Sequence, residues 1–88
     1  MNEITILSFI SEVADEILND SAYLLAGGYA TQEESEKRAF RLMAGLEYVV
    51  VKAVEKGYLS EVMAELAYAS LNCRVEENIS DENATLLG

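Results

Sequence analysis

The 88-residue sequence has one cysteine and no histidine, proline or tryptophan. Because Cys73 has no partner in the chain, the sequence excludes an intrachain disulfide and a zinc cluster built from cysteines and histidines. Sparse cysteine is typical of a reducing compartment. The absence of proline, with 51% hydrophobic residues rich in Ala and Leu, favours helices over a loop-rich or disordered domain.

The sequence also lacks the residue patterns that carry common catalytic chemistry. It has no glycine-rich phosphate loop and no serine or cysteine set beside a base. Paired carboxylates can act as acid and base, but they need a cleft that raises one pKa, and here they fall on a face predicted to be exposed. The twelve-residue calcium loop is missing as well. We therefore expect a protein that is not an enzyme and that uses no cofactor and no metal ion.

No apolar run approaches the length of about 20 residues that spans a bilayer. The N-terminus has no basic segment followed by an apolar stretch and a small-residue cleavage site. We therefore expect a cytoplasmic protein with no membrane partner.

Positive charge is scarce and unevenly placed, with six Lys and Arg against 16 Asp and Glu. Residues 1–30 carry five acidic residues and no basic residue, and residues 58–88 carry six acidic residues and only Arg74, so each segment has a net charge of −5. Residues 31–57 are neutral. Direct binding to nucleic acid is disfavoured, because phosphate contacts need clusters of Lys and Arg. The acidic segments instead predict surfaces that face solvent or a basic partner.

Hydrophobic periodicity predicts a single all-α domain, a small three-helix bundle with helices over about residues 4–26, 32–56 and 60–75. The residues expected to set these boundaries are Asn2 or Thr5, Gly27 with Gly28, the capping box Thr31–Glu34, Gly57, and Ser60. From Glu76 the composition turns polar and acidic, so residues 76–88 are expected to form a frayed or disordered tail. In this tail Ser80 can cap one short turn that carries Leu86 and Leu87.

Two of the predicted helices have apolar residues on two sides. The main face of the second is Ala39, Leu42, Met43, Leu46, Val49, Val50, Ala53 and Val54, and that of the third is Leu59, Val62, Leu66, Ala69 and Cys73. The second rows are Phe40, Ala44 and Val51 with Tyr48 beside them, and Ala64, Tyr68, Leu71 and Val75. On this assignment Cys73 is a buried, inert thiol.

The second rows predict self-association, because contiguous exposed apolar patches usually mark interfaces. The residues expected to mediate it are Phe40, Tyr48, Val51, Tyr68 and Leu71, in a dimer or another homo-oligomer. The alternative is that the C-terminal tail covers one row through Leu86 and Leu87.

Two features of the second helix leave alternatives open. The run Tyr48-Val49-Val50-Val51 has strand propensity, so a short buried strand is the alternative structure there. Gly45 costs about 1 kcal/mol relative to alanine in a helix interior. Its presence indicates either that another helix approaches closely or that the fold simply tolerates this cost.

Apolar residues of the first helix, among them Ile10, Ala14 and Ile17, share one face that is predicted to be buried. The helix carries Glu12, Asp15, Glu16 and Asp20 on its polar side, with Tyr23 beside them. Glu12, Glu16 and Asp20 lie four residues apart, so their carboxylates are spaced by about 6 Å along the helix axis. This spacing approaches the phosphate repeat of a nucleic-acid strand. Tyrosine is enriched at binding hot spots, although tyrosines also occupy core and boundary positions in bundles.

These patterns predict a non-enzymatic protein that binds another, basic protein through Glu12, Asp15, Glu16, Asp20 and Tyr23. Its sharpest form is an inhibitor of a nucleic-acid-handling protein that acts as a nucleic-acid mimic, a role that small acidic helical proteins of viruses and mobile elements can serve. The alternative function is that of a structural homo-oligomer or assembly subunit that acts by self-association.

Overall fold

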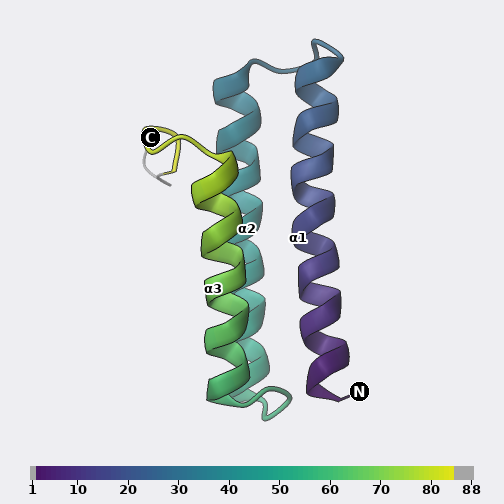
Figure 1. Ribbon diagram of the computed structural model, residues 1–88, viewed down its shortest axis with the longest axis vertical. Coiled ribbons are helices and arrows are strands. Elements are labelled where there is room, and N and C mark those ends of the chain that lie inside the picture. Colours follow the sequence, from purple (N-terminus) through teal and green to yellow (C-terminus); the bar gives the residue numbers. More distant parts are fainter. Residues whose placement is uncertain (1, 85–88) are drawn as a thin grey trace.

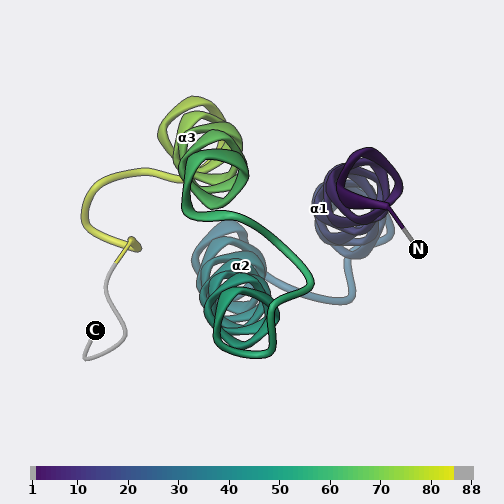
Figure 2. The ribbon, with the colours of Figure 1, turned by 90° about the horizontal axis from the view of Figure 1, so that it is seen from below.

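The computed structural model describes residues 2–84, which form three helices joined by short connections (Figure 1). Their bounds are Glu3–Ala26 for α1, Gln32–Glu55 for α2 and Glu61–Asn78 for α3. Each helix runs antiparallel to the one before it, and all three contact one another around a shared core (Figure 2). The predicted all-α three-helix bundle is therefore confirmed. The alternative strand at residues 48–51 is excluded, because these residues lie within α2.

Each helix is preceded by a residue whose side chain accepts a hydrogen bond from the backbone amide three residues later. Asn2 and Ser60 do so for α1 and α3. At the start of α2 the predicted capping box is formed: Thr31 Oγ1 accepts from the Glu34 amide at 3.1 Å, and Glu34 Oε1 accepts from the Thr31 amide at 3.0 Å. The hydrogen bonds from the backbone and side chain of Thr31 lower the pKa of Glu34. These caps confirm the local boundary predictions.

The C-terminal ends of α1 and α2 share one geometry. The Tyr29 amide donates to the Leu24 carbonyl at 2.9 Å, and the Gly28 amide donates to the Leu25 carbonyl at 3.2 Å. This nested pair places Gly28 at φ +74°, in the left-handed region that favours glycine. Gly57 has φ +78° and ends α2 with the same pair of hydrogen bonds. Both glycine stops are thus confirmed.

The core draws residues from all three helices and from the segment after each of the last two. It consists of Ile10, Ala14 and Ile17 of α1, Ala39, Met43, Leu46 and Val50 of α2, Ala64, Ala67 and Leu71 of α3, and Leu59 and Ile79. The α1 and α2 members all lie on the faces predicted to be buried. The α3 members do not.

α3 is rotated about its own axis relative to the prediction. Leu71 is fully buried at 0% exposure, and Ala64 and Ala67 are buried beside it. Val62 and Leu66, assigned to the main apolar face, are instead 69% and 58% exposed. The predicted main face of α3 is therefore wrong, and most of the predicted second row faces the core. Hydrophobic periodicity could not choose between the sides, because both carry apolar residues at helical spacing.

The rotation also exposes Cys73, which the sequence predicted to be buried. Its thiol donates a hydrogen bond to Glu77 Oε1 at 3.3 Å. This hydrogen bond, together with the negative charge of Glu77, raises the pKa of the thiol. The reactive thiolate is disfavoured mainly by a neighbouring carboxylate.

The segment that follows Glu76 packs against the bundle through residue 84, contrary to the prediction of a frayed tail. α3 continues to Asn78, and Ile79 and Asn83 are buried. Figure 2 shows this segment turning back from α3 toward α2. Glu36 of α2 binds it: Oε1 accepts from the Ser80 amide at 2.8 Å, and Oε2 accepts from Asn83 Nδ2 at 2.7 Å. The turn predicted to carry Leu86 and Leu87 lies outside the described residues.

We expect Glu36→Gln to lower the free energy of unfolding at neutral pH by about 1–2 kcal/mol, because a carboxylate that accepts from Ser80 and Asn83 becomes a weaker amide acceptor. Burial raises the pKa of Glu36, but the hydrogen bonds from Ser80 and Asn83 together hold it below its usual value. Its stabilising contribution is therefore fully present at neutral pH and is lost as the pH falls through the lowered folded-state pKa.

Urea denaturation at neutral pH and at about pH 3 measures this difference. The stability gap between the parent protein and Glu36→Gln is expected to close in acid, whereas Glu12→Gln, which alters an exposed residue of α1, leaves stability unchanged at neutral pH. A gap of equal size at both pH values would contradict the assignment.

Candidate protein-binding surfaces

The outward side of α1 carries three exposed carboxylates in successive turns. Glu12, Glu16 and Asp20 are all exposed, and none of them forms an ion pair within residues 2–84. Tyr23 continues the same line by one turn and is also exposed. We call these four residues the acidic face. It extends over about 16 Å along α1.

Asp15, which was predicted to belong to this surface, is turned toward α3. Its Oδ1 accepts from Arg74 Nε at 2.9 Å. The Arg74 guanidinium also donates to the Ser70 carbonyl at 3.3 Å, which fixes it on α3. Arg74 is the only basic residue of residues 58–88. Asp15 therefore joins α1 to α3 with its charge compensated, and it is set apart from the acidic face.

Tyr23 is half of an aromatic pair that sequence reasoning missed. Its ring stacks on that of Tyr29, with centroids 6.0 Å apart and planes inclined by 22°. Gly27 leaves the space for this contact, because a Cβ there would lie 2.5 Å from the Tyr29 ring. The closing geometry of a glycine-ended helix brings the residue after the left-handed glycine back over the last turn, which is the signal that could have identified Tyr29.

The residues predicted to mediate self-association do not form one surface. Leu71 is fully buried, so its predicted place on an accessible second row is wrong, whereas self-association itself stays a prediction. Phe40 and Tyr68 are half-buried against the core. Val51 and Tyr48 are exposed, as predicted. The rotation of α3 explains the burial of Leu71, because it turns most of the predicted second row of α3 toward the core.

Val51 and Tyr68 meet at a shallow groove between α2 and α3. The groove has a volume of about 300 Å³ and an acidic border of Glu55, Glu61 and Glu65. Tyr48 does not line it. Its ring instead lies 5.3 Å from Lys52 Nζ, a cation–π contact on the α2 surface.

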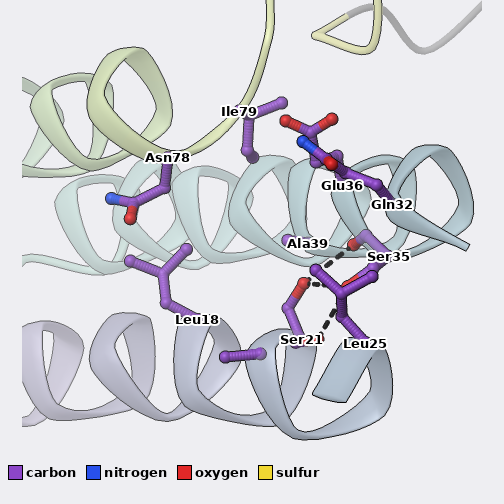
Figure 3. A pocket seen from close by; sticks show the side chains of 10 residues that line it. Leu18, Ser21, Leu25, Gln32, Ser35, Glu36, Ala39, Asn78 and Ile79 are labelled. Atoms are coloured by element: carbon purple, nitrogen blue, oxygen red, sulfur yellow. Dashed lines mark hydrogen bonds between the residues drawn. The ribbon is translucent and has the colours of Figure 1, made fainter. Parts of the chain in front are cut away.

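A second contact missed by sequence reasoning joins α1 to α2 near their connection (Figure 3). Ser35 Oγ donates to the Ser21 carbonyl at 2.7 Å, and Ser21 Oγ donates to the Ser35 carbonyl at 3.1 Å. Ser35 is buried and lies four residues before Ala39 on the core line of α2, which is the pattern that could have identified it. Both hydroxyls serve to hold two helices together.

A groove of about 160 Å³ lies beside this serine pair, between α1, α2 and the segment that follows α3. Figure 3 shows Leu18, Leu25 and Ile79 around it. Glu36 is the only ionisable residue of its lining, and its carboxylate already binds Ser80 and Asn83. The groove therefore presents a mainly apolar surface.

Within the described part of the chain, no three His, Cys, Asp or Glu side chains are arranged to hold a metal ion. Over the same residues, no helix has the length and apolar character needed to cross a membrane. Comparisons with protein-family models, with curated proteins and with solved structures found no match to this chain.

Proposed function

We propose that this protein is a non-enzymatic binding protein whose acidic face docks on a basic surface of another protein. The observation that supports this proposal most strongly is the row Glu12, Glu16 and Asp20, exposed in successive turns of α1 without a compensating cation in residues 2–84. Like charges four residues apart destabilise a helix, so helix stability does not account for the row. A basic partner would supply the missing charge.

The spacing of the row favours a partner that handles nucleic acid. The three carboxylates repeat at about 6 Å along the axis of a rigid helix, and a nucleic-acid strand likewise presents a regular row of negative charges. The Tyr23–Tyr29 stack adds an exposed aromatic surface at one end of the row, where an interface anchor would be desolvated on binding. In its sharpest form, the proposed protein is an inhibitor that occupies the basic groove of such a partner.

Charge reversal at Glu12→Lys/Glu16→Lys is expected to slow association with the partner by at least about tenfold, because electrostatic steering sets the encounter rate. Raising the salt concentration should have the same effect, since the Debye length falls from about 10 Å at 0.1 M to about 3 Å at 1 M. Fold stability should change by no more than about 0.5 kcal/mol per site. The partner is isolated by affinity capture and mass spectrometry, and its binding kinetics are then measured.

The matched control is Asp81→Lys/Glu82→Lys, which changes net charge equally at exposed positions after α3. The proposal requires the control to bind at nearly the parent rate, and an equal loss in both variants would show that only net charge matters. Nucleic acid should compete with the protein for the captured partner. Binding that survives reversal at Glu12 and Glu16 but is lost in Val62→Asp/Leu66→Asp would place recognition on the apolar side of α3.

A further inference from the structure

α2 presents an exposed line of residues that no helix of its own chain covers. The line consists of Arg38, Leu42, Gly45, Val49, Lys52 and Lys56, and we call it the α2 seam. Its members alternate at spacings of four and three residues, the spacing with which one helix packs along another. Leu42 and Val49 are 41% and 51% exposed. Arg38 and Lys56 stand at the two ends of the line, and Lys52 is half-buried and pairs with Glu55 at 2.9 Å.

Gly45 lies at the centre of the α2 seam, in open space. A Cβ added there would meet no atom within 4 Å, so no part of the described chain approaches it. Glycine weakens a helix interior relative to alanine, and it is retained where another backbone or side chain approaches closely. No residue between 2 and 84 uses the space at Gly45, which leaves it free for a side chain of another molecule.

α3 presents a second exposed line, Val62, Leu66, Ala69 and Cys73, which we call the α3 seam. Its spacings are four, three and four residues, and all four members are exposed. Acidic residues stand at both ends, with Glu61 and Glu65 near the first and Glu76 and Glu77 near the last. The one cation of α3, Arg74, is bound to Asp15 and does not offset them.

The two seams match in shape and in charge. Each has an apolar centre about two to three turns long, and the cations at the ends of one correspond to the acidic residues at the ends of the other. When the seams run parallel and are aligned centre to centre, Leu66 lies within about one residue of the level of Gly45. The largest side chain of the α3 seam then meets the only position of the α2 seam without a side chain.

We infer that the occupant of each seam is a second copy of this chain, with the α3 seam of one copy packed against the α2 seam of the next. Pairing of either seam with itself would bring like charges together, which opposes association. Arg38, Arg41 and Lys56 form no ion pair within residues 2–84 and are available to the acidic residues of the second copy.

A contact between two different surfaces leaves one of each free, so copies add head to tail and assembly grows with concentration. The interface involves one helix from each copy and is expected to be weak. It does not use the acidic face of α1, so it goes beyond the proposed function, and the acidic faces would be repeated along the assembly.

Sedimentation velocity on the full chain, from about 10 μM to about 1 mM, tests this arrangement over the range of weak interfaces. The parent protein is expected to sediment faster as its concentration rises. Gly45→Glu fills the central gap and opposes the acidic α3 seam, and Leu66→Lys opposes the basic α2 seam, so each variant alone should stay monomeric. Mixed together, they should recover association, because each retains the seam that the other has lost.

The control is Ile4→Lys, which changes an exposed apolar residue of α1 and should associate like the parent protein. Circular dichroism checks that every variant keeps its helices. A parent protein that stays monomeric over the whole range would overturn the inference. So would a Gly45→Glu or Leu66→Lys variant that associates like the parent, or a mixture of the two that stays monomeric. The test requires no other protein and is therefore independent of whether the acidic face binds a partner.

Discussion

Leu71→Ala is expected to lower the free energy of unfolding by about 2–5 kcal/mol, because it removes a fully buried side chain and leaves a cavity between the three helices. Leu66→Ala, five residues earlier on the same helix, is expected to cost no more than about 0.5 kcal/mol, since Leu66 is exposed. Small domains have total stabilities of only about 5–15 kcal/mol, so the first substitution consumes a large part of the total.

Urea denaturation followed by circular dichroism measures both variants, and the pair controls for helix propensity because both exchange leucine for alanine within α3. The side of α3 predicted from the sequence alone requires the opposite order, with Leu66→Ala the damaging change. Similar losses in both variants would mean that both sides of α3 are buried, as they would be in a stable oligomer. Repeating the Leu66→Ala measurement at low protein concentration separates that case from burial within one chain.

The sequence correctly predicted the buried face of a helix where the opposite side is polar, and it predicted helix boundaries where the capping residues are local. α1 has acidic residues opposite its apolar stripe, so periodicity correctly identified Ile10, Ala14 and Ile17 as buried. The capping box at Thr31 and the stop at Gly57 depend on interactions within a few residues and were equally predictable.

α3 could not be oriented from its sequence, because burial there depends on the neighbours that the fold supplies. Its two apolar sides are nearly equivalent by periodicity. The side that the fold buries is the one on which Ala64 and Ala67 flank Leu71. Small residues let a helix pack close to two others, a property that an apolar count does not register. The other apolar side of α3 stays exposed for the same reason, and it forms the α3 seam.

Composition also gave a wrong prediction for residues 76–84, where a few hydrogen bonds between residues distant in the sequence hold the segment in place. Residues 76–84 are polar, yet Glu36, which lies 44 residues before Ser80 in the sequence, supplies acceptors to Ser80 and Asn83. The acidic face was predicted from spacing along α1, but the pairing of Asp15 with Arg74, 59 residues away, could be seen only once α1 and α3 were placed side by side.

Ser35→Leu is expected to lower the free energy of unfolding by about 2–4 kcal/mol. Ser35 is buried, and its Cβ points at the α1 backbone, because Oγ reaches the Ser21 carbonyl at 2.7 Å. A leucine at that site loses the hydrogen bond, which is worth about 0.5–1.5 kcal/mol, and adds overpacking of about 1–3 kcal/mol against a helix backbone that yields less easily than a side chain.

Ser35→Ala is the matched control, because it removes the hydroxyl without adding volume and should cost only about 1 kcal/mol. Ser21→Ala combined with it should cost less than the two single changes together, since the two hydroxyls act in one contact. The groove beside the serine pair has space into which a leucine side chain at position 35 can turn (Figure 3). If Ser35→Leu is no worse than Ser35→Ala, the side chain has entered that groove and close approach of α1 and α2 is not required. If it is much worse, the serine pair holds the two helices at a separation that only small residues permit.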